Sequence, residues 1–435
     1  MKNNKFIKST LILIIGTFIT RAMGFIIRIL YTRIIGSDGI SLYTLIMPTY
    51  SLIVTIASFA MPITISKMVS KGTIRSKKIM AQSIYILLSI NIITMLLIIM
   101  CSDFISTTLL HESRVKILLI GASLSMPNMA LACVLKGYFY GKQRMIPNTL
   151  SNIIEQTIRI IFIIFLLPYF VKKSIILGIL SFLLINILTE GVSILTFLFL
   201  LPKNVKITIE DIKFDKSLTN NILNDSIPIV SGKLIGSFGF FLEPIILSNT
   251  LLFVGYDQSF FLKEYGVFNG YSMSLLMMPS FIVASLSTTI IPEISKYYNQ
   301  RNIKMVKKRI KECLIITMIF GVIFTSIIFL KRTFLLNLIY KTNDGANYIA
   351  VLSIFFILYY LEAPISAILQ ALNHSKYTMK TTTFGVFIKL ILMFLLSFFK
   401  IGLYSLVIAE AINIFYVVYK NYKKIKRIIR KYNYS

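Results

Sequence analysis

The sequence predicts an all-α polytopic membrane protein with about twelve transmembrane helices. Of its 435 residues, 56% are hydrophobic and only 14% are charged, whereas a soluble domain typically carries about 25% charged residues. The apolar residues form runs of about 20 or more, the length that a helix needs to cross roughly 30 Å of hydrocarbon. A large soluble helical core would show shorter runs separated by a polar stripe.

The apolar runs place the helices in order along the chain. The first run follows Lys2, Lys5 and Lys8 and superficially resembles a signal peptide, but no small-residue cleavage site follows it. Because the run continues past Arg21, we interpret it as a retained first helix. The predicted helices cover residues 7–33, 41–66, 79–101, 115–135, 148–170, 174–201, 222–251, 266–292, 309–330, 347–372, 377–398 and 400–419.

The loops predict the orientation in the membrane. One alternate set of loops, together with both termini, holds 31 Lys and Arg residues, whereas the opposite set holds 10. Cytoplasmic loops carry the excess of basic residues, so both termini are predicted to be cytoplasmic. This distribution also explains the net charge of +29 without a nucleic-acid partner. The basic segment after Lys420 is predicted to anchor the chain at anionic lipid head groups.

The chain contains an internal repeat. Met47-Pro48 in the second predicted helix corresponds to Met278-Pro279 in the eighth, and Pro62 corresponds to Pro292 at nearly the same offset. A later pair, Leu135 with Leu369, keeps a similar offset. An even number of helices per repeat makes the repeat parallel, an arrangement found in secondary transporters in which one lobe moves against the other. The predicted parts are an N-terminal six-helix lobe 1–201, a cytoplasmic linker 202–221, a C-terminal six-helix lobe 222–420 and a basic cytoplasmic tail 421–435.

Several charged residues lie inside the predicted spans. A charge at the centre of a span costs about 2.5–3.5 kcal/mol on insertion scales, so these side chains are expected to face protein, a partner or water. Glu155 and Arg159 have the spacing of an intrahelical ion pair and are expected to neutralise each other. Glu190 and Glu410 either lie near the rim of a lobe or hold helices together.

Arg21 and Arg28 are the main candidates for substrate binding. Seven residues are almost two helical turns, so both side chains project from one face of the first helix. Neither has an acid three or four positions away on that helix. Either Glu243 or another acid supplies the counter-charge, or the side chains snorkel, or they line a cavity for an anionic substrate such as a phosphate. Guanidinium geometry suits the last alternative.

Further site candidates lie on the seventh and other helices. Lys233 and Glu243 are predicted to line the cavity, and their spacing of ten residues is not that of an ion pair on one helix face. Pro48 and Pro279 are candidate hinges, because proline breaks the backbone ladder of a helix.

Catalytic, cofactor and metal motifs do not occur in the sequence. It has no phosphate-binding Gly-x4-Gly-Lys-Ser/Thr loop, so ATP hydrolysis by this chain is not expected. His111 and His374 are the only histidines, and the three cysteines have neither pairing nor metal-ligand spacing. These features predict a transporter rather than an enzyme, without a cofactor or metal site.

The segment Thr20-Arg21-Ala22-Met23-Gly24, with Arg28, Ile35-Gly36 and Met47-Pro48 after it, resembles the opening of the multidrug/oligosaccharidyl-lipid/polysaccharide exporter superfamily. The similarity is greatest to its polysaccharide-exporter branch, which includes stage V sporulation protein B. The segments 265–296 and 135–147 fit the same pattern. In the related peptidoglycan-precursor flippases this position of Arg21 is implicated in handling pyrophosphate. These flippases have an Arg-Asp pair where this chain reads Ile27-Arg28, so the resemblance supports Arg21 more than Arg28.

The resemblance implies a flippase for a lipid-linked, pyrophosphate-bearing cell-wall or polysaccharide precursor. It further implies membrane lipids and cell-wall synthesis enzymes as partners, and a role in spore cortex peptidoglycan synthesis. Two alternatives remain open from the residues. One is a cation-coupled multidrug exporter of the same superfamily, which needs unpaired acids in its cavity. The other is a membrane enzyme or scaffold of envelope assembly, which short outer loops and missing catalytic motifs disfavour.

Overall fold

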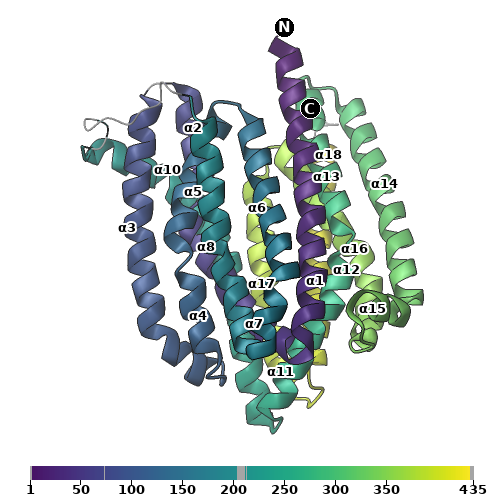
Figure 1. Ribbon diagram of the computed structural model, residues 1–435. Helices are drawn as coiled ribbons and strands as arrows, with labels where there is room; N and C mark the ends of the chain where they lie inside the picture. Colours follow the sequence, from purple (N-terminus) through teal and green to yellow (C-terminus); the bar gives the residue numbers. More distant parts are fainter. Residues whose placement is uncertain (1, 73, 203–210, 212, 432–435) are drawn as a thin grey trace. The chain divides into compact units, whose positions relative to one another are not determined.

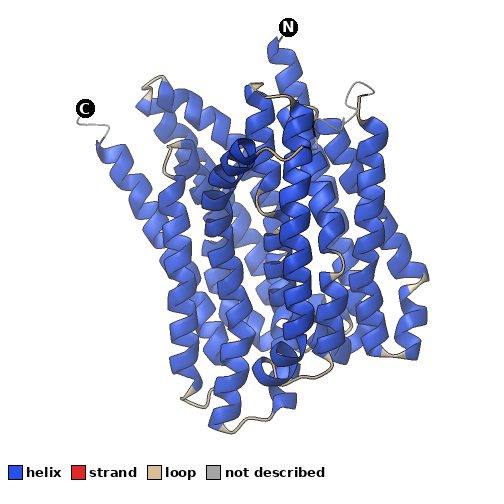
Figure 2. Ribbon diagram, turned by 90° about the vertical axis from the view of Figure 1, so that its left-hand side faces the viewer, coloured by secondary structure: helices blue, strands red, loops and turns tan. Residues whose placement is uncertain are grey.

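A computed structural model describes residues 2–72, 74–202, 211 and 213–431. Over these residues every regular element is a helix, and Figure 2 shows helices and loops without a strand. Eight of the described helices are long and apolar enough to cross a membrane, and nine if one bent pair counts as a single span. One of the eight is a 57-residue stretch, Ile15–Lys71, that contains most of the first predicted span and all of the second. The predicted all-α, multi-pass membrane fold is therefore confirmed.

The chain divides into two compact units, Met1–Phe241 and Leu242–Ser435. The division lies inside one long helix, α10, which runs from Lys216 to Val254. Residues 203–210 and 212 of the predicted linker, and residues 432–435 of the predicted tail, lie outside the described part of the chain.

The first unit is a bundle of helices that pack side by side (Figure 1). Tight pairs are α1 with α6, α2 with α5, and α6 with α8. Its helices before α10 are α1 (Lys2–Ser58), α2 (Met61–Lys71), α3 (Ser76–Asp103) with the π-helical turn η1 (Phe104–Leu109), α4 (Val115–Ser123), α5 (Met126–Gly141), α6 (Met145–Phe165), α7 (Leu167–Lys173) and α8 (Ile175–Leu200).

The first two predicted spans form one element, α1, with an interruption at Gly36. The backbone there has φ 69° and ψ −172°, a conformation that glycine adopts without a Cβ penalty. The second span then breaks at Phe59 and Ala60, which both have positive φ. Pro48 lies inside α1, so the break in this span does not coincide with the proline that the sequence suggested as a hinge.

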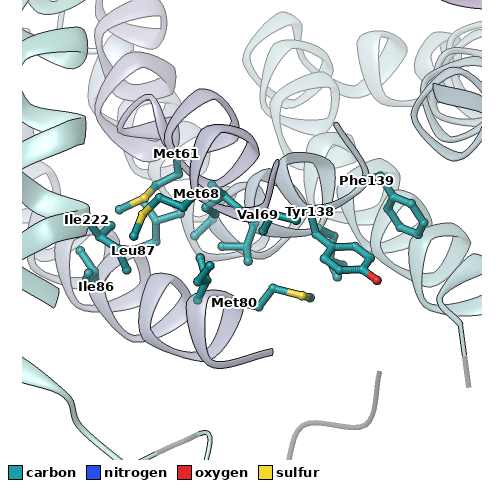
Figure 3. Packing of buried hydrophobic residues seen from close by; sticks show 14 of the residues in the cluster. Met61, Met68, Val69, Met80, Ile86, Leu87, Tyr138, Phe139 and Ile222 are labelled. Carbon is teal, nitrogen blue, oxygen red and sulfur yellow. The ribbon is translucent and has the colours of Figure 1, made fainter. Parts of the chain in front are cut away.

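Methionine and branched aliphatic side chains fill the core of the first unit. Met61 and Met68 of α2 lie close to Leu87 of α3 and Ile222 of α10, and Phe139 of α5 belongs to the same buried cluster (Figure 3). Two glycines of α5 allow the close approach of α2: a Cβ on Gly137 would lie 2.9 Å from Ile65 Cβ, and one on Gly141 would lie 2.7 Å from Val69 Cβ. Small residues at helix contacts are typical of membrane bundles, where close packing drives association.

The second unit contains the remaining helices and the end of α10. The eighth predicted span is interrupted twice, by the π-helical turn η2 and by a break at Met278-Pro279, where Pro279 precedes the first residue of α13. The helices are α11 (Gln258–Gly266), η2 (Val267–Ser272), α12 (Met273–Met277), α13 (Ser280–Asn299), α14 (Ile303–Leu330), α15 (Arg332–Tyr340), α16 (Ala346–Ala371), α17 (Ser375–Ser397) and α18 (Tyr404–Lys431).

The predicted basic tail continues the last span as part of α18. Ile425 and Ile428 are buried in a core that includes Ile294 of α13, Ile310 of α14 and Leu369 of α16. The basic side chains between Lys420 and Arg430 are mostly exposed. This part of the tail therefore packs on the second unit with one face and exposes its charges on the other.

Candidate functional site

Helix α1 carries the two arginines singled out by the sequence. Both Arg21 and Arg28 are exposed, whereas Ile27, Tyr31 and Ile35 on the same helix are buried at intervals of four residues. The arginines thus lie outside the stripe that holds α1 against the bundle. No ion pair joins Arg21 to another described residue, whereas Arg28 has electrostatic contacts within the first unit.

Arg28 belongs to a larger group of polar side chains. Tyr43, on the second half of α1, lies in the electrostatic field of both Arg28 and Arg159. Its ring packs 4.6 Å from that of Tyr31 and 5.9 Å from that of Phe182. These rings pack the two halves of α1 against α8. Tyr43 therefore lies near Arg28, although the two residues are 15 positions apart in the sequence.

Arg159 forms the predicted pair with Glu155 and also bridges two helices. Its Nη2 atom lies 3.0 Å from Glu155 Oε1, which confirms the predicted intrahelical ion pair. The same nitrogen donates to Asn186 Oδ1 at 2.8 Å and to Thr189 Oγ1 at 3.3 Å, both on α8. The two charges therefore neutralise each other, as charges within a membrane generally do. The hydrogen bonds of Arg159 also join α6 to α8.

Lys233 lies near a third polar group of the first unit. The thiol of Cys133 on α5 is in the field of Lys136, Glu190 and Lys233, and Glu190 is in turn in the field of Glu155. Lys233 is exposed on α10. Among the described residues of this network, four are basic and two are acidic: Arg28, Lys136, Arg159 and Lys233, with Glu155 and Glu190.

Glu243 is placed in a different cluster, in the second unit. It is 2% exposed, and Lys389 Nζ lies 2.5 Å from its Oε2 atom and 2.8 Å from Glu410 Oε2. Tyr265 donates a hydrogen bond to Glu243 Oε1 at 3.2 Å. The cluster joins α10, α17 and α18, and Glu362 of α16 lies in the field of Glu410. Glu410 therefore holds helices together, one of the two alternatives open from the sequence.

This cluster carries more acid than base. The carboxylates of Glu243 and Glu410 flank the single ammonium group of Lys389, and burial of a charge without compensation is costly. The counter-ion of Glu243 is Lys389, in the same unit. Among the described residues, Glu243 forms no ion pair with Arg21, so it does not supply the anion that the sequence suggested for this arginine.

Comparisons with known proteins place the chain in a family. The family model described as "Polysaccharide biosynthesis protein" matches residues 6–298, and the MatE model matches residues 240–395. The chain is 31% identical to stage V sporulation protein B of Bacillus subtilis over 409 residues, which is 91% of this chain and 79% of that protein. The chain belongs to the polysaccharide biosynthesis protein family. The resemblance that the sequence predicted is confirmed.

The chain is also similar to more distant proteins. It is 22% identical to the lipid II flippase MurJ of Bacillus subtilis, over 90% of this chain and 77% of that protein. An inward-facing multidrug resistance MATE family transporter of the MOP superfamily has a TM-score of 0.76 at 14% identity, covering 95% of this chain and 96% of that chain. A MOP superfamily transporter from Pyrococcus furiosus has a TM-score of 0.65 at 14% identity, covering 98% and 96%. The chain therefore has the fold of these MOP superfamily transporters over nearly its whole length.

The sequence missed part of the polar network of this family member. Lys136 was placed in a loop, and Arg159 and Glu190 were assigned structural roles. Their proximity to Tyr43, Lys233 and one another depends on helix packing. One sequence feature could have indicated this network. Lys136 lies within the segment Leu135–Pro147, on which the family resemblance partly rests.

Proposed function

We propose that this protein is a flippase that moves a lipid-linked saccharide, joined to its lipid by pyrophosphate, across the cytoplasmic membrane by alternating access. The observation that carries the proposal is the exposed Arg21/Arg28 face of α1. Guanidinium groups bind phosphate oxygens with bidentate hydrogen bonds, and the network beyond Arg28 has an excess of basic residues. The name of the relative MurJ, a lipid II flippase, supports the same substrate class.

In this proposal both termini are cytoplasmic, since the basic loops lie on that side. Lys233 extends the binding surface for the anionic head group, whereas the lipid tail remains in the bilayer. Pro48 and Pro279 remain hinge candidates, with Pro279 at a helix break. The relationship to stage V sporulation protein B further suggests spore cortex peptidoglycan as the destination and cell-wall synthesis enzymes as partners.

The test is binding of a purified lipid-linked precursor to the detergent-solubilised protein. We expect the Arg21→Ala/Arg28→Ala variant to lose binding, because it removes both guanidinium groups from one helix face. Arg33→Ala is the matched control, since position 33 is turned by about 140° from position 28 on the helix. Equal precursor binding by the wild type and the double variant would overturn the proposed pyrophosphate site.

A cation-coupled multidrug exporter is the second candidate. The MatE match, the buried carboxylates Glu243 and Glu410, and the half-buried Glu362 favour it, because such a pump requires acids within the membrane. A cationic dye included as a competitor separates the two functions. Saturable dye binding that depends on Glu410 and ignores the arginines would support the exporter.

A further inference from the structure

A concave site lies entirely within the second unit. Its volume is about 620 Å³, within the range of small-molecule sites. Three segments enclose it: residues 256–267 around α11, residues 343–348 at the start of α16, and residues 400–404 at the start of α18. According to the charge asymmetry of the loops, all three segments lie on the extracytoplasmic side.

Aromatic rings form the inner part of this site. Tyr256, Phe260 and Tyr404 are half-buried, and Tyr348 is buried beside Tyr404, with 5.2 Å between their ring centroids. Tyr256 and Phe260 are four residues apart and stack at 4.8 Å. A half-buried ring offers an apolar surface to a ligand while its body stays packed.

Contacts between the three segments, and one from Ser272 of η2, hold the site open before any ligand arrives. The Tyr256 hydroxyl donates to the carbonyl of Lys400 at 2.5 Å, and Ser272 Oγ donates to the carbonyl of Gly345 at 2.9 Å. The Tyr348 hydroxyl donates to Glu264. Gly402 has φ +59°, and a Cβ at this position would lie 3.2 Å from Phe260. The site is thus preformed, which lowers the entropic cost of binding.

Exposed polar groups of both signs form the rim. They comprise a carboxylate, two amides and two ammonium groups: Asp344, Asn343, Asn347, Lys263 and Lys400. Together with Glu264, the pocket lining holds two carboxylates and two ammonium groups, so it lacks the excess of positive charge that a pyrophosphate site would have. A carboxylate accepts hydrogen bonds from hydroxyl groups, and an amide both accepts hydrogen bonds from them and donates to them. Rings below and amides above match a ligand with apolar faces and hydroxyl edges.

We propose that this pocket binds the saccharide head group of the transported lipid on the extracytoplasmic side of the membrane. The proposal rests on the proposed flippase function and adds a second contact with its substrate: α1 engages the pyrophosphate and the pocket engages the sugar. A weak, preformed sugar site on the receiving side stabilises the head group after translocation and before release.

The test measures binding of N,N′-diacetylchitobiose, a soluble disaccharide, to the full-length purified protein by saturation-transfer difference NMR. We expect saturable transfer to the sugar ring protons. The variants Asp344→Asn and Asn347→Ala should weaken binding about tenfold together, because each removes hydrogen bonds at the rim. The control is Asp257→Asn. Asp257 is an exposed carboxylate directly before α11, and it does not line the pocket. All of these side chains are exposed, so the variants should remain folded.

Two outcomes would overturn the pocket. One is the absence of saturable disaccharide binding by the wild type, and the other is equal binding by the wild type and the rim variants. Neither outcome affects the Arg21/Arg28 experiment, in which the lipid-linked precursor is the ligand. Conversely, disaccharide binding could depend on the rim residues while precursor binding does not depend on the arginines. This result would support the sugar site and reject the proposed pyrophosphate site.

Discussion

Lys389 lies between two buried carboxylates and is held 2.5 Å from Glu243 and 2.8 Å from Glu410. Its side chain is 15% exposed, and those of the two acids are 2% and 12% exposed. A single ammonium group on α17 therefore connects the neighbouring helix α18 with α10, which is distant in the sequence. Because removal of one partner leaves the others buried and uncompensated, this contact is expected to be essential for the second unit.

Lys389→Met should destabilise the protein strongly. Methionine keeps much of the volume but leaves Glu243 and Glu410 without their counter-ion, at a cost of about 3–5 kcal/mol. We expect a lower midpoint of thermal unfolding in detergent. Lys380→Met on the exposed part of the same helix is the control and should change little. Adding Glu410→Gln to Lys389→Met should restore part of the loss, and a wild-type midpoint for Lys389→Met alone would contradict this role of the lysine.

The Glu155–Arg159 pair should show energetic coupling in a double-mutant cycle. Glu155→Gln and Arg159→Met each leave a partner unpaired in the first unit, so the double variant should lose less stability than the sum of the two. We expect a coupling of about 0.5–3 kcal/mol, measured from unfolding in denaturant. Thr157→Val on the exposed face of α6 is the reference substitution. Additive effects would show that the two side chains do not depend on each other.

Gly137→Ala should loosen the contact between α5 and α2. The added methyl group would lie 2.9 Å from Ile65 Cβ and 3.1 Å from Pro62 Cα, so the helices must separate. Overpacking of this kind costs about 1–3 kcal/mol. Gly191→Ala is the matched control, because a Cβ there meets no atom within 4 Å. The thermal unfolding midpoints of the two variants should differ, and equal midpoints would refute the close packing of α5 on α2.

Glu112→Gln should destabilise the protein at neutral pH but not in acid. Arg114 donates two hydrogen bonds of 2.7 Å to the Glu112 carboxylate and thereby lowers the pKa of that carboxyl. A lowered folded-state pKa gives stability that is present above the unfolded pKa of about 4.3 and is lost as the pH falls through the folded value. The effect should stay below about 1 kcal/mol, since Arg114 is half exposed.

The measurement for this prediction is the unfolding midpoint of wild type and variant between neutral and acidic pH. The two curves should converge as the carboxyl of the wild type becomes protonated. Asp103→Asn removes the more exposed pair with Lys116 and should have a smaller effect at every pH. A constant difference between Glu112→Gln and the wild type over the whole range would exclude an electrostatic origin.

The sequence by itself determined the fold class, the approximate spans and the Glu155–Arg159 pair. These depend on hydropathy over about 20 residues or on a spacing of four residues along one helix, both of which are local. The opening from Thr20 to Pro48, together with the segments 135–147 and 265–296, also indicated the family.

Tertiary structure decided which charges meet. Glu243 was expected in a cavity, but its partners Lys389 and Glu410 come from helices that no local pattern pairs with α10. The backbone breaks at Phe59-Ala60 although the prolines of this segment are Pro48 and Pro62. Helical periodicity fixes the face on which a side chain lies, but only the packing of helices against one another fixes its neighbours, since that packing balances contacts from several distant segments at once.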